Sequence, residues 1–278
     1  MVTYGQVIGQ LESKLESVGE EKEALTYVFQ ALKKWSKTHL ILSLNQEISV
    51  EDQHLLQQIA RDLLQHYPPQ YIIGSTYFCE LLLKVDERVL IPRPETEELV
   101  HLILNENPHQ TLKVLDIGTG SGAIALALKK ARPNWEVYAA DISNEALDLA
   151  RENAELNQLE ITFMQSDVYS RIVTSDFDII VSNPPYISYK DKEEVDLNVL
   201  SSEPHLALFA EENGLAIYRR IISGASEFLK DGGKLYFEIG YQQGDDLTFL
   251  VRNYLGSKRV RVLKDMFDQN RMVVVDNG

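Results

Sequence analysis

The sequence LKVLDIGTGSGAIALALKK, residues 112–130, combines three structural elements in a fixed order. Residues 112–117 have the pattern of a strand, residues 118–122 form a glycine-rich turn, and the residues after them favour a helix. This order allows a ligand to approach the backbone closely at the helix N-terminus. The stretch therefore predicts a nucleotide-type binding site within an α/β domain.

Strands and helices alternate from this stretch to the C-terminus. The expected strands are 112–117, 135–141, 161–165, 177–182, 234–239, 258–263 and 271–276, and the expected helices are 122–131, 144–157, 214–230 and 244–254. Helix 214–230 is expected to end at a left-handed glycine cap in the stretch 231–233. Strict alternation predicts a doubly wound α/β domain with a mostly parallel seven-stranded sheet. The short link between the last two strands makes that pair antiparallel.

The first part of the chain has a helical pattern instead. Apolar residues recur at helical spacing in 4–17, 22–35 and 50–65, which predicts a small helical bundle. The strand-like runs 77–84 and 87–91 favour a β-hairpin after the bundle. We therefore expect three parts, which are a helical bundle over 1–75, a β-hairpin linker over 76–92 and the α/β domain over 93–278.

A second motif follows directly after the apolar run 178–182, because residues 183–186 read Asn-Pro-Pro-Tyr. Such a run is typical of a buried parallel strand, and open α/β sheets bind ligands at the carboxyl ends of these strands. Pro184 and Pro185 stiffen the corner and lack N–H groups, so its carbonyl oxygens can accept hydrogen bonds from a ligand. With the Asn183 amide and the Tyr186 ring, the corner suits a planar –NH2 group, such as a side-chain amide or the adenine amine. The alternative is a turn that only ends the strand.

Three carboxylates follow predicted strands or end them. The glycine spacing alone fits either a nicotinamide or an adenosyl cofactor. Asp116 would repel a pyrophosphate but attract an ammonium group, which favours an adenosyl cofactor with a methionine moiety. Asp141 is placed to accept hydrogen bonds from the ribose hydroxyls of either cofactor. Asp167 either receives an adenine amine or caps a turn.

Taken in order, these motifs resemble S-adenosylmethionine-dependent methyltransferases that modify amide or exocyclic nitrogens. More narrowly, the chain is similar to the HemK/PrmC family, the peptide chain release factor glutamine methyltransferases. The segments that carry the narrower resemblance are 70–74, Phe78, 89–97, 203–204, 207–208, 214–215, 238–240 and 243–244. The resemblance covers about residues 68 to 275 and implies the class I methyltransferase fold, which is Rossmann-like.

The resemblance also implies an activity and a site. The methyl group of S-adenosylmethionine would pass to the side-chain amide nitrogen of a glutamine in a Gly-Gly-Gln loop of release factors, with S-adenosylhomocysteine as the product. The implied catalytic residues are Asn183, Pro184, Pro185 and Tyr186. The implied cofactor-binding residues are Asp116, Gly118, Thr119, Gly120, Ser121, Gly122, Asp141, Asp167, Val168 and Asn183. The helical bundle is expected to dock the release factor, and the loop 93–97 also resembles a helix start.

Composition favours a protein partner over a nucleic acid. The formal net charge is −15, whereas phosphate contacts need clustered Lys and Arg. This disfavours the runner-up function, an adenine-amine methyltransferase acting on DNA or RNA. A cofactor-binding regulator without catalysis and a nicotinamide oxidoreductase are weaker alternatives. One cysteine, six scattered histidines and no signal-peptide or membrane-spanning pattern lead us to expect a cytoplasmic protein with no metal site.

Overall fold

The computed structural model describes residues 1–108 and 111–278. Within this range the chain forms two compact units. One unit contains residues 1–75 together with 195–202, and the other contains residues 76–194 together with 203–278. In the described part of the chain, no helix is both long and apolar enough to cross a membrane.

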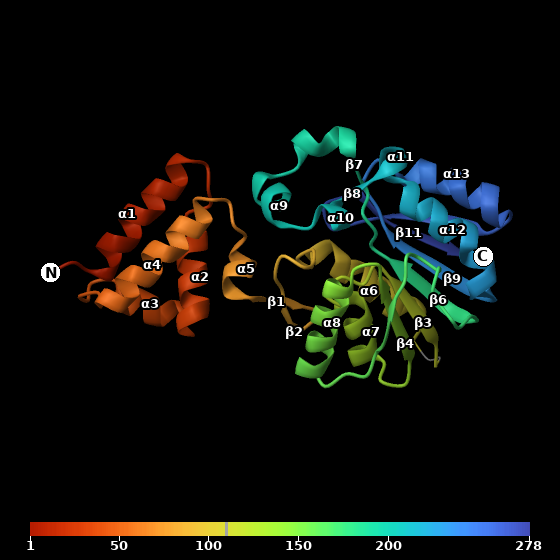
Figure 1. The fold of residues 1–278 in the computed structure, drawn as a ribbon, viewed down its shortest axis with the longest axis horizontal. Coiled ribbons are helices and arrows are strands. Elements are labelled where there is room, and N and C mark those ends of the chain that lie inside the picture. Colours follow the sequence, from red (N-terminus) through yellow and green to blue (C-terminus); the bar gives the residue numbers. More distant parts are fainter. Residues whose placement is uncertain (109–110) are drawn as a thin grey trace. The chain divides into compact units, whose positions relative to one another are not determined.

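The N-terminal unit consists of helices around its own apolar core (Figure 1). They are α1 (Tyr4–Ser17), α2 (Glu23–Lys33), α3 (Lys37–Ser43), α4 (Val50–Leu63) and α5 (Pro69–Ile73). The unit also includes α9 (Leu197–Ser202), which contributes none of the described core residues. The predicted bundle is confirmed, because α1, α2 and α4 match the three expected helices. The helical spacing places Leu56, Ile59 and Leu63 of α4 in the core. Helices α3 and α5 were not predicted, since each is too short to show a clear helical period.

The second unit is built on the predicted sheet. Its strands are β3 (Lys113–Ile117), β4 (Glu136–Asp141), β5 (Thr162–Gln165), β6 (Phe177–Ser182), β9 (Leu229–Glu238), β10 (Arg259–Lys264) and β11 (Asn270–Asp276). The strand order is β10-β11-β9-β6-β3-β4-β5, in which β11 pairs antiparallel with both β9 and β10 while the other pairs are parallel. The chain runs outward from β3 through β4 to β5 and then returns to the other side of β3 with β6. The order therefore reverses between β3 and β6, where doubly wound sheets bind ligands.

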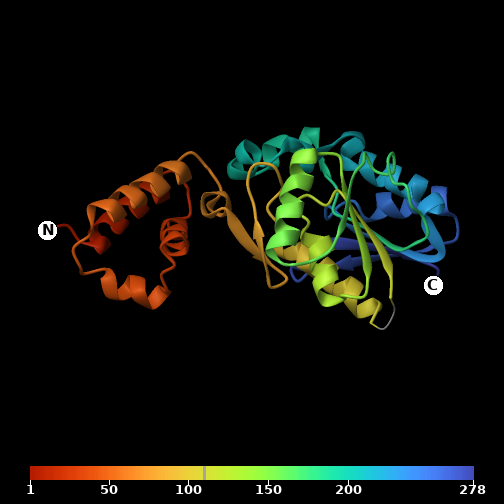
Figure 2. The same cartoon turned by 60° about the horizontal axis from the view of Figure 1, so that its bottom comes forward.

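Helices cover both faces of this sheet. They are α6 (Pro94–Glu106), α7 (Ala123–Ala131), α8 (Asn144–Leu156), α12 (Ala216–Phe228) and α13 (Gly244–Leu255). Val114 packs in a core with α6 and α7, whereas its neighbour Leu115 packs in a second core with α12 and α13. Because adjacent strand residues face opposite ways, the two cores lie on opposite faces of the sheet. Figure 2 shows the yellow α6 and the blue α12 and α13 on these two sides. The doubly wound architecture is confirmed.

Short elements complete the second unit. They are β1 (Ser75–Phe78, whose first residue belongs to the N-terminal unit), β2 (Leu81–Lys84), β7 (Ile187–Ser188), the 3-10 helix Tyr189–Glu194, α10 (His205–Leu208), β8 (Phe209–Ala210) and α11 (Glu211–Gly214). The hairpin pairs β1 with β2 through a two-residue turn with positive φ at Cys79 and Glu80. The expected second strand at 87–91 is wrong. The backbone N–H of Ile91 donates to the Glu203 side chain at 3.1 Å instead of to a neighbouring strand.

The predicted glycine cap of the helix near residue 230 is also wrong. Helix α12 ends at Phe228, and Leu229 already pairs with Phe177 in the sheet. Neither Gly232 nor Gly233 has a positive φ. A Cβ at Gly233 would lie 2.6 Å from Cγ of Leu229. This glycine is therefore needed for close packing beside the irregular start of β9, and not for a left-handed cap.

Candidate active site

A cavity of about 350 Å³ lies at the reversal point of the sheet, at the carboxyl ends of β3, β4, β5 and β6. Strands β3 and β6 are direct neighbours, with Asp116 opposite Val181, so the glycine turn after β3 lies beside the Asn-Pro-Pro corner after β6. The predicted site residues that line the cavity are Gly118, Thr119, Gly120, Ser121, Asp141, Asp167, Val168, Asn183, Pro184 and Pro185. The structure thus gathers most of the predicted site in one place.

The glycine turn forms one wall of this cavity. Gly118 and Thr119 donate their N–H groups to the Ala140 carbonyl at 2.8 and 3.0 Å, which ties the turn to β4. Gly118 and Gly120 have φ of +74° and +54°, a conformation that other residues rarely adopt. A Cβ at either position would meet no protein atom within 4 Å. The wall therefore stays open to a ligand that approaches the backbone.

Asp141 supports the same wall. Its two carboxylate oxygens accept hydrogen bonds from the N–H groups of Gly120 at 2.9 Å and Ser143 at 3.0 Å. Burial raises the pKa of Asp141, while these backbone donors act in the opposite direction. Each oxygen keeps a further lone pair, so the carboxylate can also accept hydrogen bonds from ligand hydroxyls in the cavity.

Asp116 lies beneath the turn and does not line the cavity. Its side chain is fully buried, and Oδ2 accepts a hydrogen bond from the Thr119 hydroxyl at 2.6 Å. Among the described residues, no group donates a hydrogen bond to Oδ1. Burial raises the pKa of Asp116 from its ordinary value of 3.8 to about 7. The pairing of this carboxylate with a ligand ammonium, as predicted from the sequence, stays a prediction.

The shifted pKa of Asp116 predicts a pH-dependent gain in stability for Asp116→Asn. Because folding raises this pKa, the contribution of the protonated form is complete below the unfolded pKa and is lost as pH rises through about 7. Asparagine keeps an acceptor for Thr119 and has no charge to bury. We expect it to stabilise the unliganded protein by about 2–4 kcal/mol near pH 8.5 and by less near pH 5. Thermal unfolding at the two pH values measures this, and an equal effect at both would contradict the assignment.

The Asn-Pro-Pro corner forms the opposite wall. The Nδ2 group of Asn183 donates a hydrogen bond to the Thr96 hydroxyl oxygen at 3.2 Å. In the described part of the chain, neither Oδ1 of Asn183 nor the Pro184 carbonyl accepts a hydrogen bond. The corner therefore presents two acceptors and, at Pro184 and Pro185, no backbone donor.

The Tyr186 side chain does not line the cavity. It packs against the apolar core beside α12 and α13, and this burial raises the pKa of its hydroxyl to about 12. Its carbonyl accepts a hydrogen bond from Nε2 of Gln243 at 2.9 Å, and Oε1 of Gln243 accepts one from the Gly240 N–H. The structure thus shows Tyr186 anchoring the corner, and the predicted stacking of its ring on a substrate stays a prediction. Gly122, at the start of α7, is also outside the lining.

Several lining residues were not predicted. Arg220 of α12 forms an ion pair with Asp167 at 2.8 Å, so the carboxylate beyond β5 is tied to a helix far along the chain. Val168 was predicted to bind the cofactor, but its φ of +54°, which is rare for a β-branched residue, was not. Arg93, directly before α6, and Thr96, in its first turn, belong to the segment 93–97, which carried the family resemblance without a defined role. These residues meet only through the fold, so no local pattern could reveal them.

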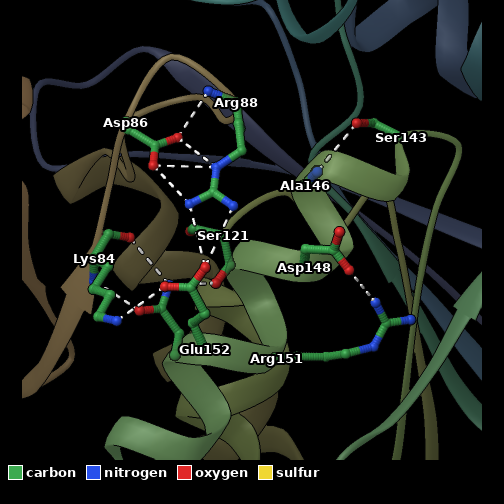
Figure 3. A network of polar contacts seen from close by, with 10 residues as sticks. Lys84, Asp86, Arg88, Ser121, Ser143, Ala146, Asp148, Arg151 and Glu152 are labelled. Carbon is green, nitrogen blue, oxygen red and sulfur yellow. Dashed lines mark hydrogen bonds and ion pairs between the residues drawn. The ribbon is translucent and has the colours of Figure 1, made fainter.

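Arg88 lies at one edge of the cavity, where two carboxylates neutralise its charge. Figure 3 shows its guanidinium between Asp86 and Glu152, and the ion-pair distances are 2.7 and 3.4 Å. Nearby, the buried Asn153 donates hydrogen bonds to the carbonyls of Lys84 and Ser121 at 3.1 and 2.9 Å. Helix α8 is therefore hydrogen-bonded both to the end of β2 and to the glycine turn, and its Glu152 pairs with Arg88 beside the turn.

Comparison with known proteins shows the family of the chain. Residues 6–74 match the model of the PrmC N-terminal domain, and residues 96–207 match that of the methyltransferase small domain. The chain is 59% identical over 274 residues to the release factor glutamine methyltransferase of Streptococcus pneumoniae, covering 98% of each chain. It is 50% identical over 256 residues to the enzyme of the same name from Lactococcus lactis, covering 92% of this chain and 94% of that one. The chain belongs to the release factor glutamine methyltransferase family.

A solved structure shows the same fold at low identity. The 16S rRNA N2 G1207 methyltransferase of T. thermophilus is 16% identical, with a TM-score of 0.52 over 73% of this chain and 50% of that one. The family assignment confirms the resemblance inferred from the sequence. It also identifies the chain as a member of an S-adenosylmethionine-dependent methyltransferase family.

Two family segments meet at the mouth of the cavity. Arg93 forms an ion pair with Glu203 at 2.5 Å, and the other oxygen of Glu203 accepts the Ile91 N–H. Glu203 is almost fully buried, which raises its pKa, while the charge of Arg93 acts against this shift. The segments 89–97 and 203–204 of this release factor glutamine methyltransferase are therefore joined by a buried carboxylate. Among the described residues, no cluster of His, Cys, Asp and Glu is arranged to hold a metal ion.

Proposed function

We propose that this chain transfers a methyl group from S-adenosylmethionine to the side-chain amide nitrogen of a glutamine in peptide chain release factors. The observation that carries this proposal is the pair of unpaired acceptors, Oδ1 of Asn183 and the Pro184 carbonyl, at the cavity wall. A primary amide has two N–H donors, and two acceptors can orient it. The names of the relatives that share 59% and 50% identity with the chain give the same substrate.

The cofactor is proposed to bind at the glycine turn. Gly118 and Gly120 leave the wall open, Asp141 offers acceptors for ribose hydroxyls, and Asp167 and Val168 line the adenine end. The cofactor, when bound, supplies a methyl group on a positively charged sulfonium and leaves as S-adenosylhomocysteine.

The residues of the corner act on the substrate amide. An amide nitrogen is a poor nucleophile because its lone pair is delocalised into the carbonyl, so orientation must supply much of the rate. Asn183 and Pro184 would each accept one N–H of the glutamine and fix the direction of its nitrogen. These acceptors would also stabilise the positive charge that develops on the nitrogen during methylation. The methylated nitrogen then loses one proton to water, which makes a strong general base unnecessary.

The N-terminal unit is proposed to dock the release factor. Its helix α3 exposes Ile41 and Leu42 to solvent, at 56% and 70% of their surface. We expect Ile41→Glu with Leu42→Glu to raise KM for the intact release factor by about tenfold through lost apolar contact. The rate on a short Gly-Gly-Gln peptide should stay unchanged. Equal kinetics of the variant and the original protein on the intact factor would contradict this role.

Mass spectrometry tests the proposed function itself. A bacterial release factor is incubated with the protein and S-adenosylmethionine, and its peptides are compared with those of an untreated sample. We expect one added methyl group on the glutamine of the Gly-Gly-Gln peptide. Labelled cofactor with DNA and RNA tests the adenine-amine alternative, which the family and the net charge of −15 do not favour. Methylated nucleic acid with an unmodified release factor would overturn the proposal.

A further inference from the structure

A buried carboxylate lies behind the corner, on the side away from the cavity. Glu238, at the end of β9, is 2% exposed and does not line the cavity. Its Oε2 accepts a hydrogen bond from the Thr96 hydroxyl at 2.6 Å. Thr96, in the first turn of α6, in turn accepts a hydrogen bond from Nδ2 of Asn183 at 3.2 Å. Three segments thus meet in one buried hydrogen-bonded chain.

The donor and acceptor roles in this series of hydrogen bonds allow only one orientation of the Asn183 amide. A hydroxyl has a single proton, and Thr96 donates it to Glu238, so the Thr96 oxygen offers only lone pairs to Asn183. The ionised Glu238 carboxylate on the same inner side, whose pKa Asn183 lowers, also offers only lone pairs, so the inner side of the amide faces acceptors. The –NH2 group must therefore face inward, which leaves Oδ1 for the cavity. A flipped amide would place its oxygen against two acceptors in a buried environment.

We propose that Glu238 and Thr96 are positioning residues that lock the Asn183 amide so that its oxygen, and not its –NH2 group, meets the substrate nitrogen. The inference rests on the proposed function, because it concerns the acceptor that the glutamine amide uses. It gives a role to the family segments 89–97 and 238–240, which contact with the substrate or the cofactor does not explain. Neither positioning residue touches the reacting atoms in this role.

The surroundings make this lock sensitive to pH. Burial raises the pKa of Glu238 to about 7, whereas the Thr96 hydrogen bond and the charge of Arg271 lower it. The titratable and charged groups around Glu238 are Arg271 on β11, Glu95 on α6, Tyr186 after β6 and Tyr218 on α12. Only the ionised carboxylate enforces the inward –NH2 group, because a protonated one can donate to Thr96 and release its hydroxyl proton. We therefore expect kcat to rise with pH through about 7.

Thr96→Val tests the lock, because valine matches the shape of threonine and removes the hydroxyl. We expect kcat on the release factor to fall about 10- to 100-fold, as for the loss of one oriented polar partner. The dissociation constant of S-adenosylhomocysteine should change less than about threefold. Thr96→Ser keeps the hydroxyl and should restore most of kcat. The glutamine in Glu238→Gln has no titratable proton. The kcat of this variant should therefore no longer fall as the pH is lowered through about 7.

The controls separate this inference from the proposed function. If the unmodified protein does not methylate the release factor, the proposed function fails before any variant is compared. If it does, and Thr96→Val matches it in kcat, the lock is wrong. The lock is also overturned if Thr96→Val loses cofactor affinity as much as kcat, since that result indicates general disruption of the fold. An acidic limb that persists in Glu238→Gln would overturn the role of Glu238.

Discussion

Replacing Asn183 with alanine is expected to lower kcat by about 100- to 1000-fold at saturating S-adenosylmethionine. The variant loses one of the two acceptors at the cavity wall, so the substrate amide is neither aimed nor stabilised as charge develops. The cofactor would be held chiefly by the glycine turn and by Asp141, which this change does not touch. Its dissociation constant should therefore change less than about threefold, as measured by calorimetry with S-adenosylhomocysteine.

Asn134→Ala is a matched control for this experiment. Asn134 also donates its amide to a threonine hydroxyl, that of Thr111, but on an exposed part of the surface. The control should keep both kcat and the cofactor dissociation constant. The role of Asn183 is contradicted if Asn183→Ala loses cofactor affinity while turnover at saturation stays normal.

A methyl group added at Gly214 is expected to displace the Asn-Pro-Pro corner, although Gly214 does not line the cavity. Gly214 has φ of +84°, and a Cβ there would lie 2.0 Å from the Tyr186 carbonyl oxygen and 2.7 Å from Nε2 of Gln243. Backbone or side chain must move, and the hydrogen bond that anchors Tyr186 must break. We expect Gly214→Ala to destabilise the second unit by about 2–5 kcal/mol and to lower kcat at least about 100-fold. Thermal unfolding and steady-state kinetics measure the two effects.

Gly74→Ala is the control for Gly214→Ala, because it has the cost of the left-handed backbone conformation without the steric clash. Gly74 has a similar φ of +77°, but a Cβ there would meet no atom within 4 Å. It should cost only about 1–2 kcal/mol, the usual penalty of a left-handed residue. A Gly214→Ala protein with normal kcat and no greater loss of stability than Gly74→Ala would contradict the anchoring of the corner by this close contact.

The parts of the fold that the sequence predicted are those set by neighbouring residues. Strand β3, its glycine turn and α7 follow one another within about twenty residues, and the corner follows β6 directly. Parallel pairing at the reversal point then brings these two motifs together, so most of the site could be predicted without a structure. The same local patterns identified the long helices of the N-terminal unit.

The errors and omissions concern contacts between distant residues. Thr96 and Glu238 lie 142 positions apart, and Arg220 and Asp167 lie 53 apart, so no spacing rule joins them. The run 87–91 has the composition of a strand, but the Ile91 N–H donates to the Glu203 side chain and the Val89 N–H to the Asp86 carbonyl. The burial of the Asp116 side chain beneath the turn is likewise a feature that its position after the strand does not reveal. Burial and side-chain direction depend on the whole fold, which a local pattern does not contain.

The most direct test of the account is a crystal structure with S-adenosylhomocysteine and a Gly-Gly-Gln peptide of a release factor. We expect the glutamine amide nitrogen to lie within about 3.2 Å of both Oδ1 of Asn183 and the Pro184 carbonyl oxygen. We also expect the –NH2 group of Asn183 to face Thr96 and Glu238. A glutamine nitrogen bound away from these two oxygens, next to the cofactor sulfur, would contradict the account.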